Sequence, residues 1–145
     1  MRIIIEEPIE KEEEESVIFR VNRMAGKVSR AIDILKAPED LTVYLDNQAL
    51  LLPVPEVFYI ESVDLKTFVC TKDNVYLSKL KLYEIEDLLN KGEFLRTSKQ
   101  IIISLRKIRS VSPAGGGRFE ALLMNNEKIM ISRQYVPKLK ERFKL

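Results

Sequence analysis

The spacing of hydrophobic and polar positions changes near residue 40 and divides the chain into two parts. Before this point, apolar residues recur at helical spacing, and Pro38 predicts that the helix stops near Lys36. From residue 41 onward, short apolar stretches alternate with turn residues, which is typical of strands joined by tight hairpins. We therefore expect an N-terminal regulatory or dimerisation segment over residues 1–40 and a separate domain over residues 41–145.

The N-terminal segment has the pattern of a small β-β-α unit. Arg2–Glu6 is predicted to be a short strand, and Ser16–Val21 alternates as a second strand does. Glu10–Glu15, between them, is interpreted as a solvated charge run. The helix is predicted from five apolar positions: Met24, Val28, Ala31, Ile32 and Leu35. Its single apolar stripe must pack on the main domain or on a partner.

The second part has the pattern of a mainly β (α+β) fold with two short helices. Three dipeptides between apolar strands predict tight turns, because Asn and Asp tolerate the left-handed backbone of hairpins: Asp46-Asn47, Asp73-Asn74 and Asn125-Asn126. The helices are expected over Leu80–Asn90 and Arg133–Phe143, with Ser132 as the cap of the second. Three glycines in Ser112–Gly117 indicate a flexible hairpin tip, since no GK[ST] follows them.

One stretch of this part is unusual for a small β-protein. Phe94–Ile108 (FLRTSKQIIISLRKI) begins as a strand, breaks at Ser98 and Lys99, and resumes with the wholly apolar Ile101–Ile103. The polar, basic corner is either a surface turn that contains a lysine or a tip that the strands hold toward a polyanion. The stretch alone does not decide between these two.

Composition removes most enzyme classes. The chain has no histidine, so it has no His general base and no zinc site of the usual Cys/His kind. The single cysteine, Cys70, lies in an apparent strand interior and fits a reducing cytoplasm. We therefore expect a protein without enzymatic activity, cofactor or metal. We also expect it to be cytoplasmic, because no apolar run approaches membrane-spanning length and the acidic start is unlike a signal peptide.

Charge is distributed unevenly along the chain. The net charge is +2, but residues 96–145 carry twelve basic and three acidic side chains. A basic concentration of this kind is the electrostatic footprint expected for a phosphate backbone. From composition alone, double-stranded DNA, RNA and an acidic protein stay open as partners.

Three motifs in order resemble the LytTR DNA-binding domain of bacterial transcription regulators. Val57–Ser62 (VFYIES) and Val75–Leu89 (VYLSKLKLYEIEDLL) resemble its opening strands and helix. Phe94–Ile108 is similar to the signature F-x-R-x-H-x-S-x-x-V-N-x-x-x-I, and Ile129–Tyr135 (IMISRQY) to the closing S-R-x-Y. The Ser98-Lys99 pair at the corner resembles the residues found there in the family's short, stand-alone members, which lack a receiver domain.

The resemblance implies an elongated stack of small antiparallel β-sheets whose inter-strand loops enter successive major grooves on one face of the duplex. It also implies a promoter-binding transcription factor, expected as a homodimer, and in this branch a small membrane-embedded inhibitor as a further partner. A protein-interaction module for that partner and an RNA-binding surface are the alternative readings.

Carried onto this sequence, the resemblance places DNA contacts in three regions. They are the loop Asp64–Thr67, the corner that follows Arg96, and the start of the last helix. The residues that it implies are Lys66, Thr67, Arg96, Ser98, Lys99, Gln100, Ser132, Arg133 and Gln134. Arg and Lys read guanine or grip phosphate, and Gln pairs with adenine. Arg96 fits equally a solvent-exposed face or an ion pair.

The sequence departs from the family pattern at several of these positions. Ser98 stands where many members have His, Gln100 where Ser is usual, and Ser104 where Asn is usual. The family's base contacts fall closest to Thr67, Lys99 and Gln134, and none of these three is the commonest residue there. The preferred operator sequence therefore does not follow from the resemblance.

Overall fold

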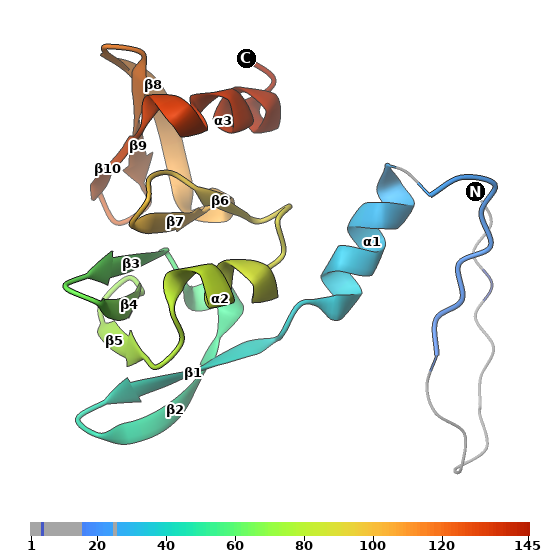
Figure 1. Cartoon of the computed structure of the whole chain (residues 1–145), viewed down its shortest axis with the longest axis horizontal. Helices are drawn as coiled ribbons and strands as arrows, with labels where there is room; N and C mark the ends of the chain where they lie inside the picture. The colour runs from blue at the N-terminus through green and yellow to red at the C-terminus, as the bar shows by residue number, and fades with distance from the viewer. Residues whose placement is uncertain (1–3, 5–15, 25) are drawn as a thin grey trace.

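The computed structural model describes residue 4, residues 16–24 and residues 26–145. Within these residues the chain forms ten strands and three α-helices (Figure 1). The helices are α1 (Lys27–Lys36), α2 (Leu82–Leu88) and α3 (Val136–Phe143). The strands are β1 (Asp40–Leu45), β2 (Gln48–Pro53), β3 (Tyr59–Val63), β4 (Lys66–Cys70), β5 (Val75–Ser78), β6 (Phe94–Arg96), β7 (Ile101–Ser104), β8 (Ile108–Gly115), β9 (Arg118–Leu123) and β10 (Lys128–Ile131).

The strands form two antiparallel sheets. Seven strands follow the order β2-β1-β5-β4-β3-β7-β6, and three follow the order β10-β9-β8. The sheets lie one above the other in Figure 1, with α2 beside the larger sheet and α3 beside the smaller one. The predicted mainly β fold is confirmed, although one wide sheet takes the place of several small ones.

Two hydrophobic cores hold this arrangement together, and β7 contributes to both. Ile102 belongs to the core between the larger sheet and α2, together with Ile60 and Val69. Its neighbour Ile103 points to the opposite face and joins the core beneath the smaller sheet and α3. Because successive side chains of a strand point to opposite faces, a strand buried on both faces must be apolar throughout. This double burial explains the wholly apolar run 101–103.

A polar contact joins the two sheets beside the second core. The Tyr59 hydroxyl donates to Glu127 Oε2 at 2.7 Å, and Asn125 Nδ2 donates to the other carboxylate oxygen at 2.8 Å. Burial raises the pKa of the Tyr59 phenol, and its hydrogen bond to Glu127 raises the pKa further. Tyr59 therefore stays protonated and keeps donating across the sheets at neutral pH.

Two of the three predicted dipeptide turns contain left-handed residues, whereas Asp73-Asn74 connects β4 to β5 without a positive φ. Asp46 and Asn47 have positive φ angles of 49° and 63°, and Asn126 has a φ of 69°. The turn between β3 and β4 is also left-handed, at Asp64 and Leu65, with φ angles of 48° and 65°. Gly115, Gly116 and Gly117 all have positive φ, as a glycine hairpin tip requires.

The helices are shorter than the sequence predicted. The predicted helix over residues 80–90 begins at Leu82 and ends at Leu88. The last helix does not begin at Arg133, because Arg133–Tyr135 is a 3-10 turn and α3 starts at Val136. Ser132 makes no side-chain capping bond, so its predicted capping role was wrong. Pro137 lies in the first turn of α3, where a proline needs no hydrogen-bonding N–H.

The N-terminal part is only partly as predicted. The helix exists as α1, ends at Lys36 before Pro38, and has no fully buried residue. Residues 16–21 are exposed and form no strand, so that prediction was wrong: among residues 16–24 and 26–145 no neighbouring strand edge supplies backbone partners there. The predicted strand over residues 2–6 and the acidic run over residues 10–15 lie outside the described residues. No helix of the described part is long and apolar enough to cross a membrane.

Candidate nucleic-acid interface

The corner between β6 and β7 is held by the side chain of Arg96. Its Nε donates to the carbonyl oxygen of Ser98 at 2.7 Å, and its Nη2 donates to the carbonyl oxygen of Lys99. Its Nη1 forms an ion pair with Glu86 of α2 at 3.3 Å. A guanidinium can bind several acceptors at once because its donors are fixed in one plane. In this structure the Arg96 side chain therefore stabilises the backbone of the corner, and the ion pair is one of the two alternatives that its sequence pattern predicted.

The side chains of the corner divide into one that is used internally and two that are free. Ser98 is half-buried, and its hydroxyl oxygen accepts the N–H of Gln100 at 3.1 Å. Thr97 before it is fully buried. Lys99 and Gln100 are exposed, and neither side chain has a hydrogen-bond partner among the described residues. The corner therefore presents one ammonium and one amide group on a fixed backbone.

The turn between β3 and β4 places Lys66 and Thr67 in different surroundings. Lys66 is exposed at the start of β4, whereas Thr67 is only 5% exposed. The side chain of Thr67 lies on the face of the sheet where Ser62 and Ser78 flank it on the neighbouring strands. Of these two predicted contact residues, the structure exposes only Lys66.

Leu65, at the tip of the same turn, is a residue that sequence reasoning missed. Its side chain is fully exposed, and its φ is 65°. A branched, apolar residue in left-handed backbone is strained, and such strain gathers at functional positions. The signal was present in the sequence as a leucine at a position where a hairpin favours Asn or Gly.

The third region lies between β10 and α3. Arg133 and Gln134 are exposed on the 3-10 turn, and Ser132 is half-buried before them. A Cβ added at Gly117 would lie 2.7 Å from both Cγ and Cδ of Arg133. The glycine tip between β8 and β9 therefore packs directly against the aliphatic part of Arg133. Sequence reasoning did not connect these two segments.

Backbone hydrogen bonds bring the three regions together around the corner. The N–H of Ser62 in β3 donates to Gln100 at 2.8 Å, and the N–H of Ser132 donates to Thr97, also at 2.8 Å. The register of β3 against β7 pairs Glu61 with Ile101, so the Leu65 turn and the corner lie at the same end of the larger sheet. In Figure 1 the β6–β7 hairpin lies between the β3–β4 hairpin and the smaller sheet.

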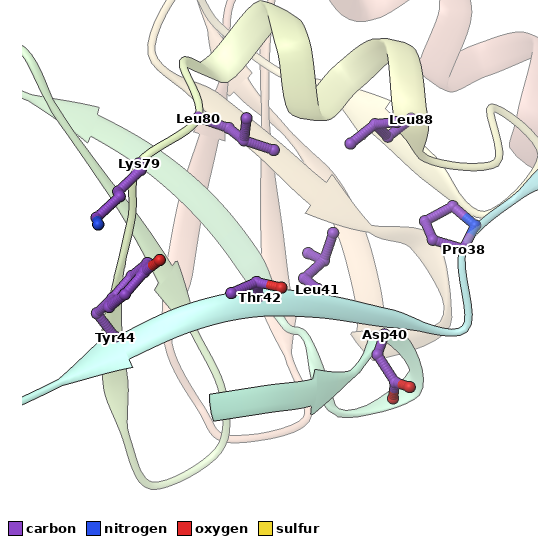
Figure 2. A pocket seen from close by; sticks show the side chains of 8 residues that line it. All are labelled: Pro38, Asp40, Leu41, Thr42, Tyr44, Lys79, Leu80 and Leu88. Carbon is purple, nitrogen blue, oxygen red and sulfur yellow. The ribbon is translucent and has the colours of Figure 1, made fainter. Parts of the chain in front are cut away.

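A charged cleft of about 570 Å³ runs beside the Arg96–Glu86 pair, between α2 and α3. Its basic lining residues are Arg30, Lys91, Arg96, Lys138 and Arg142, and its acidic ones are Glu86 and Glu141. The excess of cations adds to the positive field near the corner. A second hollow, about 350 Å³ in volume, lies between β1 and α2 and contains none of the predicted contact residues (Figure 2).

Cys70 plays no part in this interface. It is buried in β4, and burial raises the pKa of its thiol to about 11. The thiol is therefore protonated and unreactive at neutral pH.

The fold is that of a class of β-rich DNA-binding domains. A solved LytTr DNA-binding domain of a putative methyl-accepting/DNA response regulator from Bacillus cereus matches it with a TM-score of 0.71. The match covers 75% of this chain and 100% of that domain, at 24% sequence identity.

The family itself is shown by sequence. The LytTr DNA-binding domain family matches residues 47–144, and the chain belongs to this family. The sensory transduction protein LytT of Enterococcus faecalis is 26% identical over 140 residues, and an uncharacterized HTH-type transcriptional regulator of Staphylococcus aureus is 25% identical over 126 residues. The matches cover 95% and 87% of this chain. The chain spans 58% of the length of the first relative and 85% of the second.

Proposed function

We propose that this protein is a transcription regulator that binds promoter DNA through the three loop regions at one end of its larger sheet. The regions are the turn at Leu65 and Lys66, the corner at Lys99 and Gln100, and the 3-10 turn Arg133–Tyr135. Each of them enters the major groove or contacts its phosphate rim, and together they follow one face of the duplex.

The observation that carries the proposal is the construction of the corner. Lys99 and Gln100 are exposed and unpaired within the described residues, while Arg96 and the bonds from Ser62 and Ser132 fix the backbone beneath them. A polar tip that only faced solvent would need no such support. A tip that reads base edges does, because hydrogen bonds to bases require defined positions.

The exposed residues divide by chemistry into readers and phosphate contacts. Gln100 and Gln134 carry the donor–acceptor pair that matches adenine, and Lys99 and Arg133 match guanine or phosphate. Lys66 contributes a further cation at the neighbouring turn. Thr67, Arg96 and Ser98 support these residues, because their side chains are buried or already bonded.

We further propose that two copies act together on repeated half-sites, with the N-terminal segment as the dimerisation or regulatory part. Several apolar side chains of residues 16–24 and of α1 are exposed, among them Ile18, Met24 and Ile34, which leaves an interaction surface outside the DNA-binding domain. In the stand-alone branch that the sequence resembles, a membrane-embedded inhibitor would act on the same part of the chain.

The proposal is tested first by sequencing the DNA that the purified protein selects from a random pool. Affinities for the selected duplex and for a scrambled duplex of equal length are then compared at moderate salt. We expect the selected duplex to bind at least a hundredfold more tightly. Equal affinities would refute promoter recognition, and a preference for single-stranded RNA would favour the alternative function.

Lys99→Ala tests the corner itself. Loss of a base contact should weaken specific binding by about 1–3 kcal/mol. Loss of a phosphate contact alone should weaken all sequences equally and reduce the salt slope by about one. Lys72→Ala is the matched control, because Lys72 is an exposed lysine in the turn at the opposite end of β4.

A further inference from the structure

The hollow between β1 and α2, called the groove below, lies beside one edge of β1 (Figure 2). Strand β1 pairs with β5 only at Tyr44 and Leu77, so the edge of β1 before Tyr44 has no strand partner on its α2 side. Apolar side chains line the groove beside this edge, including Pro38, Leu41, Leu80 and Leu88. An unpaired strand edge next to an apolar groove and a helix is the arrangement that binds peptides by strand addition.

The described residues of the chain leave the groove unfilled. Leu88 faces it from the end of α2 and is 46% exposed, which is high for a leucine in a helix that packs on a core. The volume of about 350 Å³ accommodates two or three apolar side chains. The groove therefore needs an occupant with alternating apolar residues in extended conformation.

Residues 16–21 (SVIFRV) have this pattern and pair with no strand in the described part of the chain. They are all exposed, with Val17 63% and Ile18 74% exposed, and they form no strand. The alternation places Val17, Phe19 and Val21 on one side of an extended chain. Pairing with the β1 edge would supply the backbone partners that this segment lacks.

Charge favours this pairing over other occupants. Residues 16–36 carry five basic side chains and one acidic one, whereas residues 37–65 carry six acidic side chains and no basic one. Glu39 and Asp40 are both exposed, and Asp40 is one of the residues that line the groove, with its carboxylate on the side of β1 away from α2 (Figure 2). Arg20 lies within the extended segment, and Arg23 follows it by two residues. Complementary charges of this kind orient two surfaces and exclude wrong partners.

The course of the chain indicates that the occupant comes from a second copy. Ala37 is extended with ψ 142°, and Pro38 fixes the next φ, so the chain turns away from the groove into α1, whose Arg30 lines the charged cleft beside α3 (Figure 1). Two copies side by side can exchange their segments without altering this connection, and the resulting dimer closes with two identical contacts.

We propose that residues 16–21 of one copy add as a strand to the β1 edge of a second copy and fill the groove between β1 and α2. The proposal rests on the two-copy assembly proposed above and identifies the surfaces that form it. It leaves the DNA-contacting end of the sheet free.

A charge exchange tests both the contact and its intermolecular nature. Arg20→Glu/Arg23→Glu reverses the segment, and Glu39→Lys/Asp40→Lys reverses the groove. By light scattering of the full chain, we expect each variant alone to be a monomer at concentrations where the unmodified protein is a dimer. An equimolar mixture of the two should regain the dimer, because each segment then meets a groove of opposite charge.

Two results would overturn the proposal. One is an unmodified protein that stays monomeric at 100-fold the concentration of the DNA-binding assay; the other is a mixture that stays monomeric, as docking within one chain predicts. Leu88→Ser should raise the dimer dissociation constant at least tenfold, whereas Tyr83→Ser, at an exposed position of α2 outside the groove, should not. The affinity for a single DNA half-site should be the same in all variants. If no variant and not even the unmodified protein binds DNA, the proposed function is refuted, while the molar masses from light scattering still test the dimer.

Discussion

Replacement of Arg96 separates two roles of this residue, a DNA contact and an internal support. In the structure its guanidinium binds the carbonyl oxygens of Ser98 and Lys99 and the carboxylate of Glu86. If these bonds are its function, the residue matters for the shape of the corner rather than for its charge.

The stability effect follows from the bonds that are lost. In Arg96→Ala the two carbonyl groups regain water at the surface, so each lost hydrogen bond costs roughly 1 kcal/mol net. The ion pair adds roughly 0.5 kcal/mol, because its side chains are 19% and 37% exposed and solvent screens them. We expect a free energy of unfolding lower by about 2–3 kcal/mol in urea titrations. Arg96→Lys keeps the charge but cannot span both carbonyls, so it should lose about half of this.

DNA binding of the same variants gives the decisive comparison. If Arg96 supports the corner, Arg96→Lys should bind the selected duplex several-fold more weakly in fluorescence anisotropy, with an unchanged salt slope. Glu86→Gln should also weaken binding, although it removes a negative charge near the DNA. The support role is refuted if Arg96→Lys binds normally, Glu86→Gln binds more tightly, and Arg96→Ala lowers the salt slope by about one, as a phosphate contact would.

Three other residues give independent tests. Gly117→Ala should displace the side chain of Arg133 and strain a φ of 75°, so it should lower both DNA affinity and the thermal midpoint, whereas Gly115→Ala, with open space around its Cβ, should lower the midpoint alone. Leu65→Asn should relieve the left-handed strain and raise the free energy of unfolding by about 1 kcal/mol in urea titrations. It should also weaken DNA binding if the exposed leucine contacts thymine methyl groups, and an unchanged affinity would show that Leu65 is not part of the interface. Because the pKa of Cys70 rises from 9.0 to about 11 on folding, the stability it contributes is complete below pH 9 and is lost between pH 9 and 11; Cys70→Val should flatten this alkaline decline, and an identical decline in both proteins would contradict the assignment.

Elements whose causes are local could be predicted from the sequence. Asp46 and Asn47 turn a hairpin because their own side chains tolerate left-handed backbone, and Pro38 limits α1 because it lacks an N–H. The apolar run 101–103 likewise identified a strand that is buried on both faces. The family motifs added the three regions where DNA contacts are expected.

Tertiary structure decided which residues of those regions are available. Thr67 and Arg96 both have side chains that suit DNA. The strand register buries Thr67, and Arg96 forms an ion pair with Glu86, which lies ten residues earlier on α2. The bond from Ser132 to Thr97 and the packing of Gly117 on Arg133 join segments far apart in the chain. Residues 16–21 have the alternation of a strand yet form none, because a strand needs a neighbouring edge that no local pattern supplies. Local preference is encoded in a few adjacent residues, whereas exposure and pairing depend on what the rest of the fold brings alongside.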